Sequence, residues 1–239
     1  MSLTVNNSKD LAGGKISALF YGVSGVGKSR LLASFPNILI IVTEEGMKST
    51  VDLAVDTISP ISWEEILQII QTLKTHVKGT QVEFNGKLYD SIGIDSLTTL
   101  HTLILKSVLR MNKREMAQLQ DWGLAGDRVE TVIQAIMSLP VHFGATALEQ
   151  IDKDEIIGKI YAAPMIPGKL SRKIPALFDE VFQLRLEQKI DGKSERVVLT
   201  QPDSIYMARD RSGKLAKFES FQLEKPRDNE LWKKINLIS

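Results

Sequence analysis

The stretch Gly22-Val23-Ser24-Gly25-Val26-Gly27-Lys28-Ser29 matches the pattern G-x-x-x-x-G-K-[ST] at every fixed position. An apolar run at residues 16–21 precedes it and predicts a strand, and residues 28–34 have helical character. Glycines let the backbone curl so that its N–H groups point at a phosphate, and the following helix N-terminus adds partial positive charge. The alternative is a glycine-rich turn that matches the pattern by chance. The strand before the motif and the helix after it favour a phosphate-binding loop, because a chance turn would not require either of them. We therefore expect this loop to bind a nucleoside triphosphate.

The last two residues of the motif have separate expected roles. Lys28 would reach the outer phosphates and assist catalysis, and the Ser29 hydroxyl would ligate Mg²⁺. The base preference stays open, because adenine is usually held by backbone and apolar groups that leave no motif. The residues expected to contact the nucleotide are Gly22, Val23, Ser24, Gly25, Val26, Gly27, Lys28, Ser29 and Arg30.

The composition is that of a folded protein without special redox chemistry. Hydrophobic residues make up 43% of the 239 residues, and the formal net charge of +1 provides no global attraction to nucleic acid. The absence of cysteine excludes disulfides, thiolate zinc sites and cysteine nucleophiles. The longest aliphatic run, Ile38–Val42, is too short to cross a bilayer, and the first ten residues do not resemble a signal peptide. We expect a cytoplasmic protein with no membrane partner.

The order of elements predicts an α/β fold in one domain. Residues 1–14 are expected to be a flexible lead-in to a single domain at 15–239. Apolar runs predict parallel strands at 16–21, 38–42, 91–95 and 141–147, with helices at 63–73, 98–111 and 127–139 between them. Alternating patterns predict antiparallel strands at 180–187, 196–200 and 205–208, and a short helix at 230–235 ends the chain. The expected architecture is a mainly parallel sheet wound with helices and extended by C-terminal antiparallel strands.

Two acidic positions follow predicted strands and could complete a hydrolytic site. Asp95 ends the apolar run 91–95, where its carboxylate could hold Mg²⁺ through water, although it could also simply cap the next helix. Glu44 follows the strand 38–42 and could activate the attacking water, with Glu45 as the second choice. The alternative for both glutamates is an ordinary polar loop.

This arrangement resembles the RecA-like ATPases, and most closely the phage-encoded RecA-like proteins that act in single-strand annealing or recombination. The resemblance covers nearly all of residues 15–225. It depends on Phe35-Pro36, Thr43-Glu44, Asp95-Ser96-Leu97-Thr98, Pro164-Met165-Ile166-Pro167-Gly168-Lys169 and Phe178-Asp179-Glu180-Val181. It implies a RecA-like P-loop fold, ATP as the nucleotide and Glu44 as the catalytic base. The chain departs from the family at two places. Relatives often carry an Asp at the position of Val42, and a His is common after Thr-Ala in the stretch Thr146-Ala147-Leu148-Glu149. Thr146 is therefore our candidate for the γ-phosphate sensor.

The stretch Ala208-Arg209-Asp210-Arg211-Ser212-Gly213 resembles the Lys-x-Arg-x-Gly element of RecA-like hexameric helicases. That resemblance implies that Arg209 and Arg211 are catalytic and reach a neighbouring subunit's γ-phosphate, for which a permanently charged guanidinium is suited. Such a role requires self-association into a ring or filament. A solvated turn with Arg–Asp pairing is the alternative.

Single-stranded DNA is the expected partner, and a single-strand DNA-binding protein is a candidate partner. In RecA-type proteins the loops that bind single strands correspond to Met111–Gly126 and Glu149–Lys173 here, so the resemblance implies that these segments bind DNA. Both combine basic with aromatic residues, as a sequence-tolerant single-strand site requires, although acidic residues dilute the second segment. A basic face that is simply solvated is the alternative. The residues concerned are Arg110, Lys113, Arg114, Trp122, Tyr161, Lys169, Arg172 and Lys173. Three other classes stay open: a regulatory GTPase or switch, a small-molecule kinase, and a nucleotide-gated scaffold without a DNA role.

Overall fold

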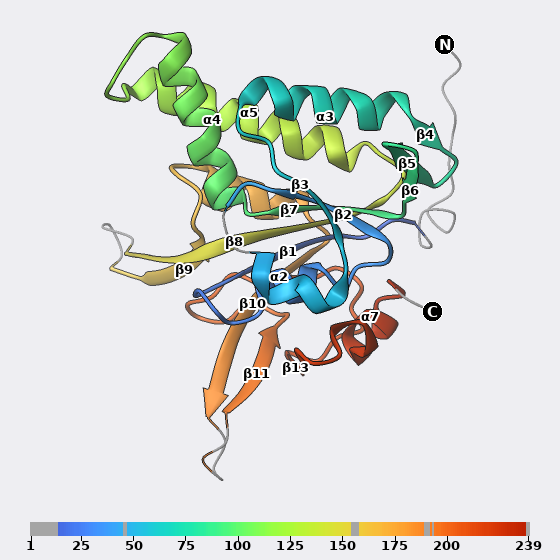
Figure 1. Cartoon of the computed structure of the whole chain (residues 1–239). Coiled ribbons are helices and arrows are strands. Elements are labelled where there is room, and N and C mark those ends of the chain that lie inside the picture. Colours follow the sequence, from blue (N-terminus) through green and yellow to red (C-terminus); the bar gives the residue numbers. More distant parts are fainter. Residues whose placement is uncertain (1–13, 45–46, 154–157, 189–191, 193, 238–239) are drawn as a thin grey trace, which may run out of the picture.

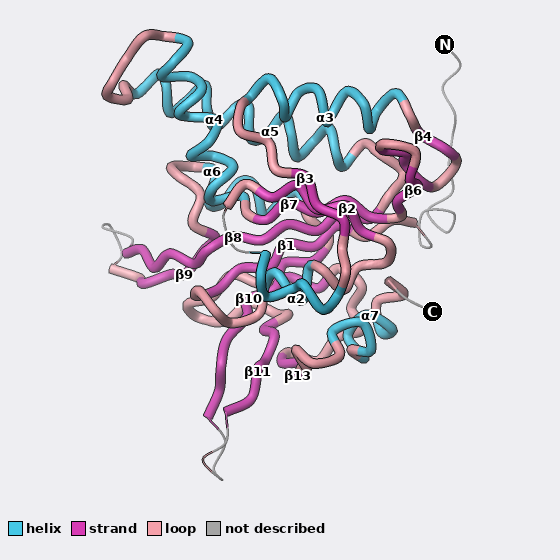
Figure 2. Tube along the Cα trace, in the orientation of Figure 1, coloured by secondary structure: helices cyan, strands magenta, loops and turns pink. Residues whose placement is uncertain are grey.

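The computed structural model describes residues 14–44, 47–153, 158–188, 192 and 194–237. Its central sheet has the strand order β13-β11-β10-β1-β8-β7-β2-β3, with β12 paired to β10 and β9 paired to β8 (Figures 1 and 2). Parallel strands form the centre of this sheet, and antiparallel strands extend it on the β10 side. The expected architecture, a mainly parallel sheet wound with helices and extended by C-terminal antiparallel strands, is confirmed. The expected lead-in at 1–14 lies outside the described residues except for Gly14.

The parallel strands bring their carboxyl ends to one edge of the sheet. They are β1 (Ser17–Gly22), β2 (Ile38–Val42), β3 (Asp56–Ile58), β7 (Ser91–Asp95), β8 (His142–Lys153) and β10 (Glu180–Gln188). The register pairs Gly22 with Leu148 and Val42 with Asp95. The phosphate-binding motif, the end of β2 and the end of β7 therefore meet at this edge, as the apolar runs predicted.

Helices cover both faces of the sheet (Figure 1). One face carries α3 (Trp63–Thr75), α4 (Leu97–Met111) and α5 (Leu119–Met137), and the other carries α2 (Lys28–Leu32) and α7 (Glu230–Lys234). Each face has its own apolar core, because the buried strands present alternate side chains to opposite sides. A smaller sheet of β4 (Val77–Lys78), β5 (Gln81–Phe84) and β6 (Lys87–Tyr89) stands apart from the central one.

Two glycines let α2 approach the sheet closely. Gly93 of β7 and Gly144 of β8 are register partners under this helix. A Cβ at Gly144 would lie 2.4 Å from Cδ1 of Leu32 in α2, and one at Gly93 would lie 3.3 Å from the same atom. Larger residues here would push α2 outward. The distance between the sheet and α2, the helix that follows the phosphate-binding motif, is therefore set by these close contacts.

Several elements differ from those expected. Helix α5 begins at Leu119, eight residues before the expected start, and β8 continues to Lys153 to form a hairpin with β9 (Ile160–Pro164). Residues 205–208 do not form a third antiparallel strand; β12 (Arg209–Asp210) and β13 (Phe218–Ser220) join β10 and β11 (Ser194–Leu199) instead. The remaining helices are short: the α-helix α6 (Leu170–Lys173) and the 3-10 helices η1 (Met47–Leu53), η2 (Ile174–Leu177) and η3 (Pro226–Asp228).

Candidate active site

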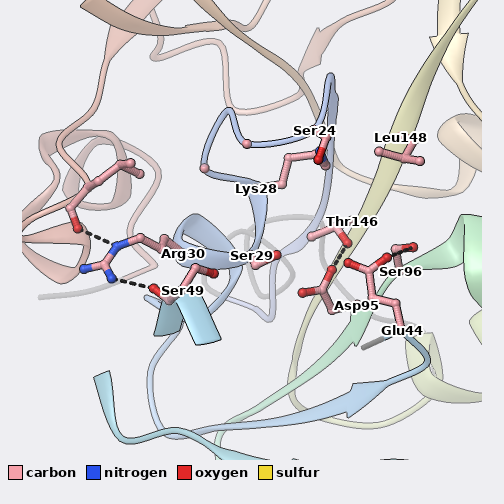
Figure 3. A pocket seen from close by; sticks show the side chains of 13 residues that line it. Ser24, Lys28, Ser29, Arg30, Glu44, Ser49, Asp95, Ser96, Thr146 and Leu148 are labelled. Carbon is pink, nitrogen blue, oxygen red and sulfur yellow. Dashed lines mark hydrogen bonds between the residues drawn. The ribbon is translucent and has the colours of Figure 1, made fainter. Parts of the chain in front are cut away.

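The phosphate-binding motif forms the turn between β1 and α2 (Figure 3). Gly22 has φ +155°, and a Cβ there would lie 2.4 Å from the Leu184 carbonyl oxygen. Gly27 caps α2 with φ +111°, a conformation that side chains with a Cβ rarely adopt. Both positions therefore require glycine for steric reasons. The backbone that results curls around the start of α2, as the motif predicts.

Lys28 points back over the loop. Its ammonium group donates hydrogen bonds to the carbonyl oxygens of Gly22, at 3.0 Å, and Val23, at 2.8 Å. Burial lowers the pKa of Lys28, and the nearby carboxylates of Asp95 and Glu44 oppose that shift. A phosphate group bound here would supply the ammonium with a charged partner in place of neutral carbonyl oxygens.

Asp95 lies at the carboxyl end of β7 and is 2% exposed. It accepts a hydrogen bond from the hydroxyl of Thr146, which is fully buried on the neighbouring strand β8. Figure 3 shows Ser29 beside this carboxylate, on the α2 side of the cavity. A hydroxyl and a carboxylate are hard oxygen ligands of the kind that Mg²⁺ takes beside phosphates. The residues present therefore fit the expected cation, which Ser29 and Asp95 would hold.

Glu44 follows β2 and lies next to Asp95 and Ser96 (Figure 3). Ser96 Oγ donates to Glu44 Oε2 at 3.3 Å, while the hydroxyl of Thr43 lies 2.7 Å from that of Thr99 in α4. Burial raises the pKa of Glu44, and the neighbouring Asp95 carboxylate raises it further. A carboxylate with a raised pKa is a better proton acceptor near neutral pH.

These side chains line one cavity of about 450 Å³ at the carboxyl edge of the sheet. Lys28, Glu44 and Asp95 all contribute to it, as expected, and their chemical roles remain predictions. Glu45, the second choice for the base, lies outside the described residues. The complete lining is Ser24, Gly25, Gly27, Lys28, Ser29, Arg30, Glu44, Ser49, Asp95, Ser96, Thr146, Leu148 and Leu223.

Arg30 lines the cavity, but its guanidinium is bonded to this chain and not directed at the phosphate position. It forms a bidentate ion pair with Asp52, at 2.7 and 2.8 Å, and donates to the carbonyl oxygens of Ser49, at 2.6 Å, and Leu223, at 2.8 Å. Sequence reasoning missed these partners, because Leu223 is 193 residues away along the chain. It also missed Leu223, Ser49 and Leu148 as lining residues.

Arg209 and Arg211 lie at the opposite, amino edge of the sheet. Arg209 pairs in register with Val181, near the start of β10. Arg209 donates to the carbonyl oxygens of Ala176 and Phe178, and Arg211 forms an ion pair with Asp179 at 2.6 Å. Neither arginine lines the cavity of its own chain. Any contact with a nucleotide phosphate would therefore have to involve another subunit.

The two segments expected to bind DNA differ in structure. Much of Met111–Gly126 is helical: Trp122 stacks on His101 at 5.6 Å, and Arg114 is paired with the buried Asp121 at 2.7 Å. These two residues are therefore occupied within the fold, which corrects the expectation of a free loop. The segment 149–173 includes the β8–β9 hairpin, beside which the Arg172 guanidinium lies 4.5 Å from the Tyr161 ring.

The described part of the chain contains no group of three or more His, Asp or Glu side chains arranged to hold a metal by themselves. A cation at Ser29 and Asp95 would thus need the phosphates of the nucleotide to complete its coordination. Within the same residues, no helix has the length and apolar character needed to span a membrane.

The cavity combines three features: a glycine-rich phosphate loop, a buried aspartate at a strand end and a second carboxylate. Together these features define a P-loop nucleotide-binding ATPase. The sequence profile of the AAA domain family matches residues 14–212, and the chain belongs to that family. A comparison with curated proteins gives no match.

Solved structures show the same fold. The RadB recombinase superposes with a TM-score of 0.50 at 13% identity, over 89% of this chain and 88% of that one. A KaiC-like protein from the hyperthermophilic archaeon Pyrococcus horikoshii OT3 superposes with a TM-score of 0.51 at 14% identity, over 89% of this chain and 87% of that one. At this level of identity the likeness concerns the RecA-like fold alone.

Proposed function

We propose that the chain is a Mg²⁺-dependent ATPase that acts on single-stranded DNA as an oligomer, in phage-type recombination or strand annealing. The observation that carries the hydrolytic part is the shared cavity of Lys28, Ser29, Glu44 and Asp95. Lys28 would pair with the outer phosphates, and Ser29 with Asp95 would hold the cation that neutralises their charge. Glu44 would accept the proton of the attacking water, for which its raised pKa is suited.

Thr146 connects this chemistry to the β8–β9 hairpin. The strand β8 runs without interruption from His142 to Lys153, so the residue bonded to Asp95 and the base of the hairpin share one strand. Basic and aromatic residues around the hairpin, among them Tyr161, Lys169 and Arg172, are suited to the phosphates and bases of a single strand. The likeness to a structure titled as a recombinase agrees with this role.

The position of the two arginines supports the proposed oligomerisation. Because β12 lies at the sheet edge opposite the cavity, Arg211 could complete the site of an adjacent subunit but not its own. Its side chain is 59% exposed and so could reach a neighbour. Arg209 is bonded to two backbone carbonyls and would hold the strand in place.

The test is ATP hydrolysis with and without single-stranded oligonucleotide. We expect DNA to stimulate turnover, and we expect Arg172→Ala to lower that stimulation, whereas Lys74→Ala on α3, an exposed lysine of equal charge, should not. Turnover that is indifferent to DNA would favour a small-molecule kinase or a scaffold, and a preference for GTP would favour a switch. Turnover indifferent to DNA would overturn the DNA part of the proposal, and a preference for GTP would overturn the choice of ATP.

A further inference from the structure

One end of the cavity lies away from the residues expected to bind the outer phosphates and the cation. Figure 3 shows Arg30 and Ser49 on the side of Ser29 away from Asp95, Glu44 and Thr146. A triphosphate whose outer groups lie at Lys28 must extend its sugar and base in the opposite direction, past Ser29. This end, lined by Arg30, Ser49 and Leu223, is therefore where the nucleoside would lie.

Leu223 forms the apolar surface at this end. A Cβ at Gly27 would lie 2.6 Å from Leu223 Cδ2 and 3.3 Å from Phe221 Cε2, so both side chains pack directly on the phosphate loop. Leu223 is partly buried and lines the cavity. A nucleobase has apolar faces that gain free energy when they leave water for such a surface.

Leu223 is held in place by a closed turn. Asn229 Oδ1 accepts from the Gln222 N–H at 3.0 Å, and its Nδ2 donates to the Pro226 carbonyl at 2.8 Å. Just beyond the turn, Trp232 is fully buried and donates to Ser34 Oγ at 2.7 Å. The position of Leu223 is thus set by the fold and not by a loose tail.

Arg30 connects this turn to the other side of the cavity. Its Nε–H donates to the Leu223 carbonyl, while its two terminal nitrogens hold Asp52 and the Ser49 carbonyl on η1. Four of the five N–H groups of this guanidinium are engaged in these bonds. Little donor capacity is left for reading the polar edge of a base.

We propose that Leu223 is the wall on which the base of the bound nucleotide packs, and that Arg30 is a positioning residue that holds this wall against the phosphate loop. The inference rests on the proposed nucleotide site and assigns its base-binding part. The wall belongs to a segment beyond residue 212, where the family match ends. Because the contact is apolar and uses the face of the base, it strengthens binding of ATP and GTP alike.

The experiment measures dissociation constants for ATP, GTP and inorganic tripolyphosphate, each with Mg²⁺, by calorimetry on the full chain. We expect Leu223→Ala to weaken ATP and GTP roughly tenfold, which corresponds to about 1.4 kcal/mol. Tripolyphosphate has no base, so its affinity should stay within about twofold of wild type. Leu223→Met should restore the ATP affinity, and Leu186→Ala, at an exposed leucine of β10, is the matched control.

Arg30→Ala should give the same pattern as Leu223→Ala in weaker form, because it frees the turn without removing the wall. Equal loss of ATP and tripolyphosphate in Leu223→Ala would overturn the proposal, since it would show damage to the phosphate loop itself. Unchanged ATP affinity would also overturn it, since the base would then lie elsewhere. Failure of the nucleotide site as a whole is distinguishable, because wild type would then bind none of the three ligands.

Discussion

Replacing Glu180 with Gln should stabilise the fold at neutral and alkaline pH. Glu180 opens β10 and is 3% exposed, and its Oε2 has no hydrogen-bond partner within the described residues. The group accepts hydrogen bonds from the backbone N–H groups of Arg211 and Ser212, but it also faces the carboxylates of Asp210 and Asp179. Burial, followed by the charge of Asp210, raises the pKa of Glu180 to about 7.

The direction of the effect follows from proton linkage. In the unfolded chain Glu180 titrates at its ordinary value of 4.5, whereas in the folded chain it holds its proton up to a pKa of about 7. Its protonation thus supports the fold fully below pH 4.5, and this support is lost as the pH rises to 7 and beyond. The difference between the two values corresponds to about 3 kcal/mol of unfolding free energy.

Urea unfolding between pH 5 and pH 8.5 measures this quantity. Wild type should lose about 2.5 kcal/mol more stability across this range than Glu180→Gln, which resembles the neutral acid at every pH. Glu115→Gln, at an exposed position between α4 and α5, should follow wild type. Parallel stability curves for wild type and Glu180→Gln would refute the reasoning, because the carboxyl group would then titrate alike in both states.

Three further predictions concern the site and its support. Glu44→Gln should keep ATP affinity and lower turnover by roughly 10²–10⁴-fold, measured by phosphate release, and if Glu45→Gln does so instead, the base is the next residue. Trp232→Ala should cost roughly 3–5 kcal/mol in urea unfolding, because this buried ring packs on Phe20 and Phe35, with ring centroids 5.9 and 5.4 Å apart. The loss should clearly exceed that of Trp122→Ala, because Trp122 is 42% exposed. Arg211→Ala should impair turnover, and mixing it with Lys28→Ala subunits should partly restore it; a mixture no more active than its parts would exclude a role between subunits.

The phosphate end of the site could be predicted because it depends on local pattern. The motif at 22–29 has its own strand and helix, and short apolar runs predicted the strands that end at Val42 and Asp95. Parallel strands place their carboxyl ends at one edge, so two strand-end acids had to lie near the loop. Neither step requires knowledge of how distant side chains pack.

The start of α5 could not be predicted, because glycines near that end of the helix are typical of a turn when only the local sequence is considered. Gly123 and Gly126 both lie inside the helix, where glycine is unfavourable. In the structure a Cβ at Gly126 would lie 3.0 Å from Leu170 Cδ1, so this glycine admits a neighbour 44 residues away. The same limit applies to the β8–β9 hairpin, whose pairing depends on strand partners and not on periodicity.

The end of the cavity proposed to bind the base could not be predicted from a sequence motif, because an apolar surface does not require one. Phosphate binding needs N–H groups in a fixed curl, which restricts residue types over eight consecutive positions. An apolar wall needs only one side chain of suitable shape, and any segment that the fold brings to the site can provide it. Here that segment follows β13, and it reaches the loop because the buried Trp232 packs on Phe20 of β1 and on Phe35, and donates to Ser34 just after α2. If Leu223 binds the base, packing of the C-terminal helix and nucleotide affinity are coupled, and Trp232→Ala should weaken ATP binding more than tripolyphosphate binding.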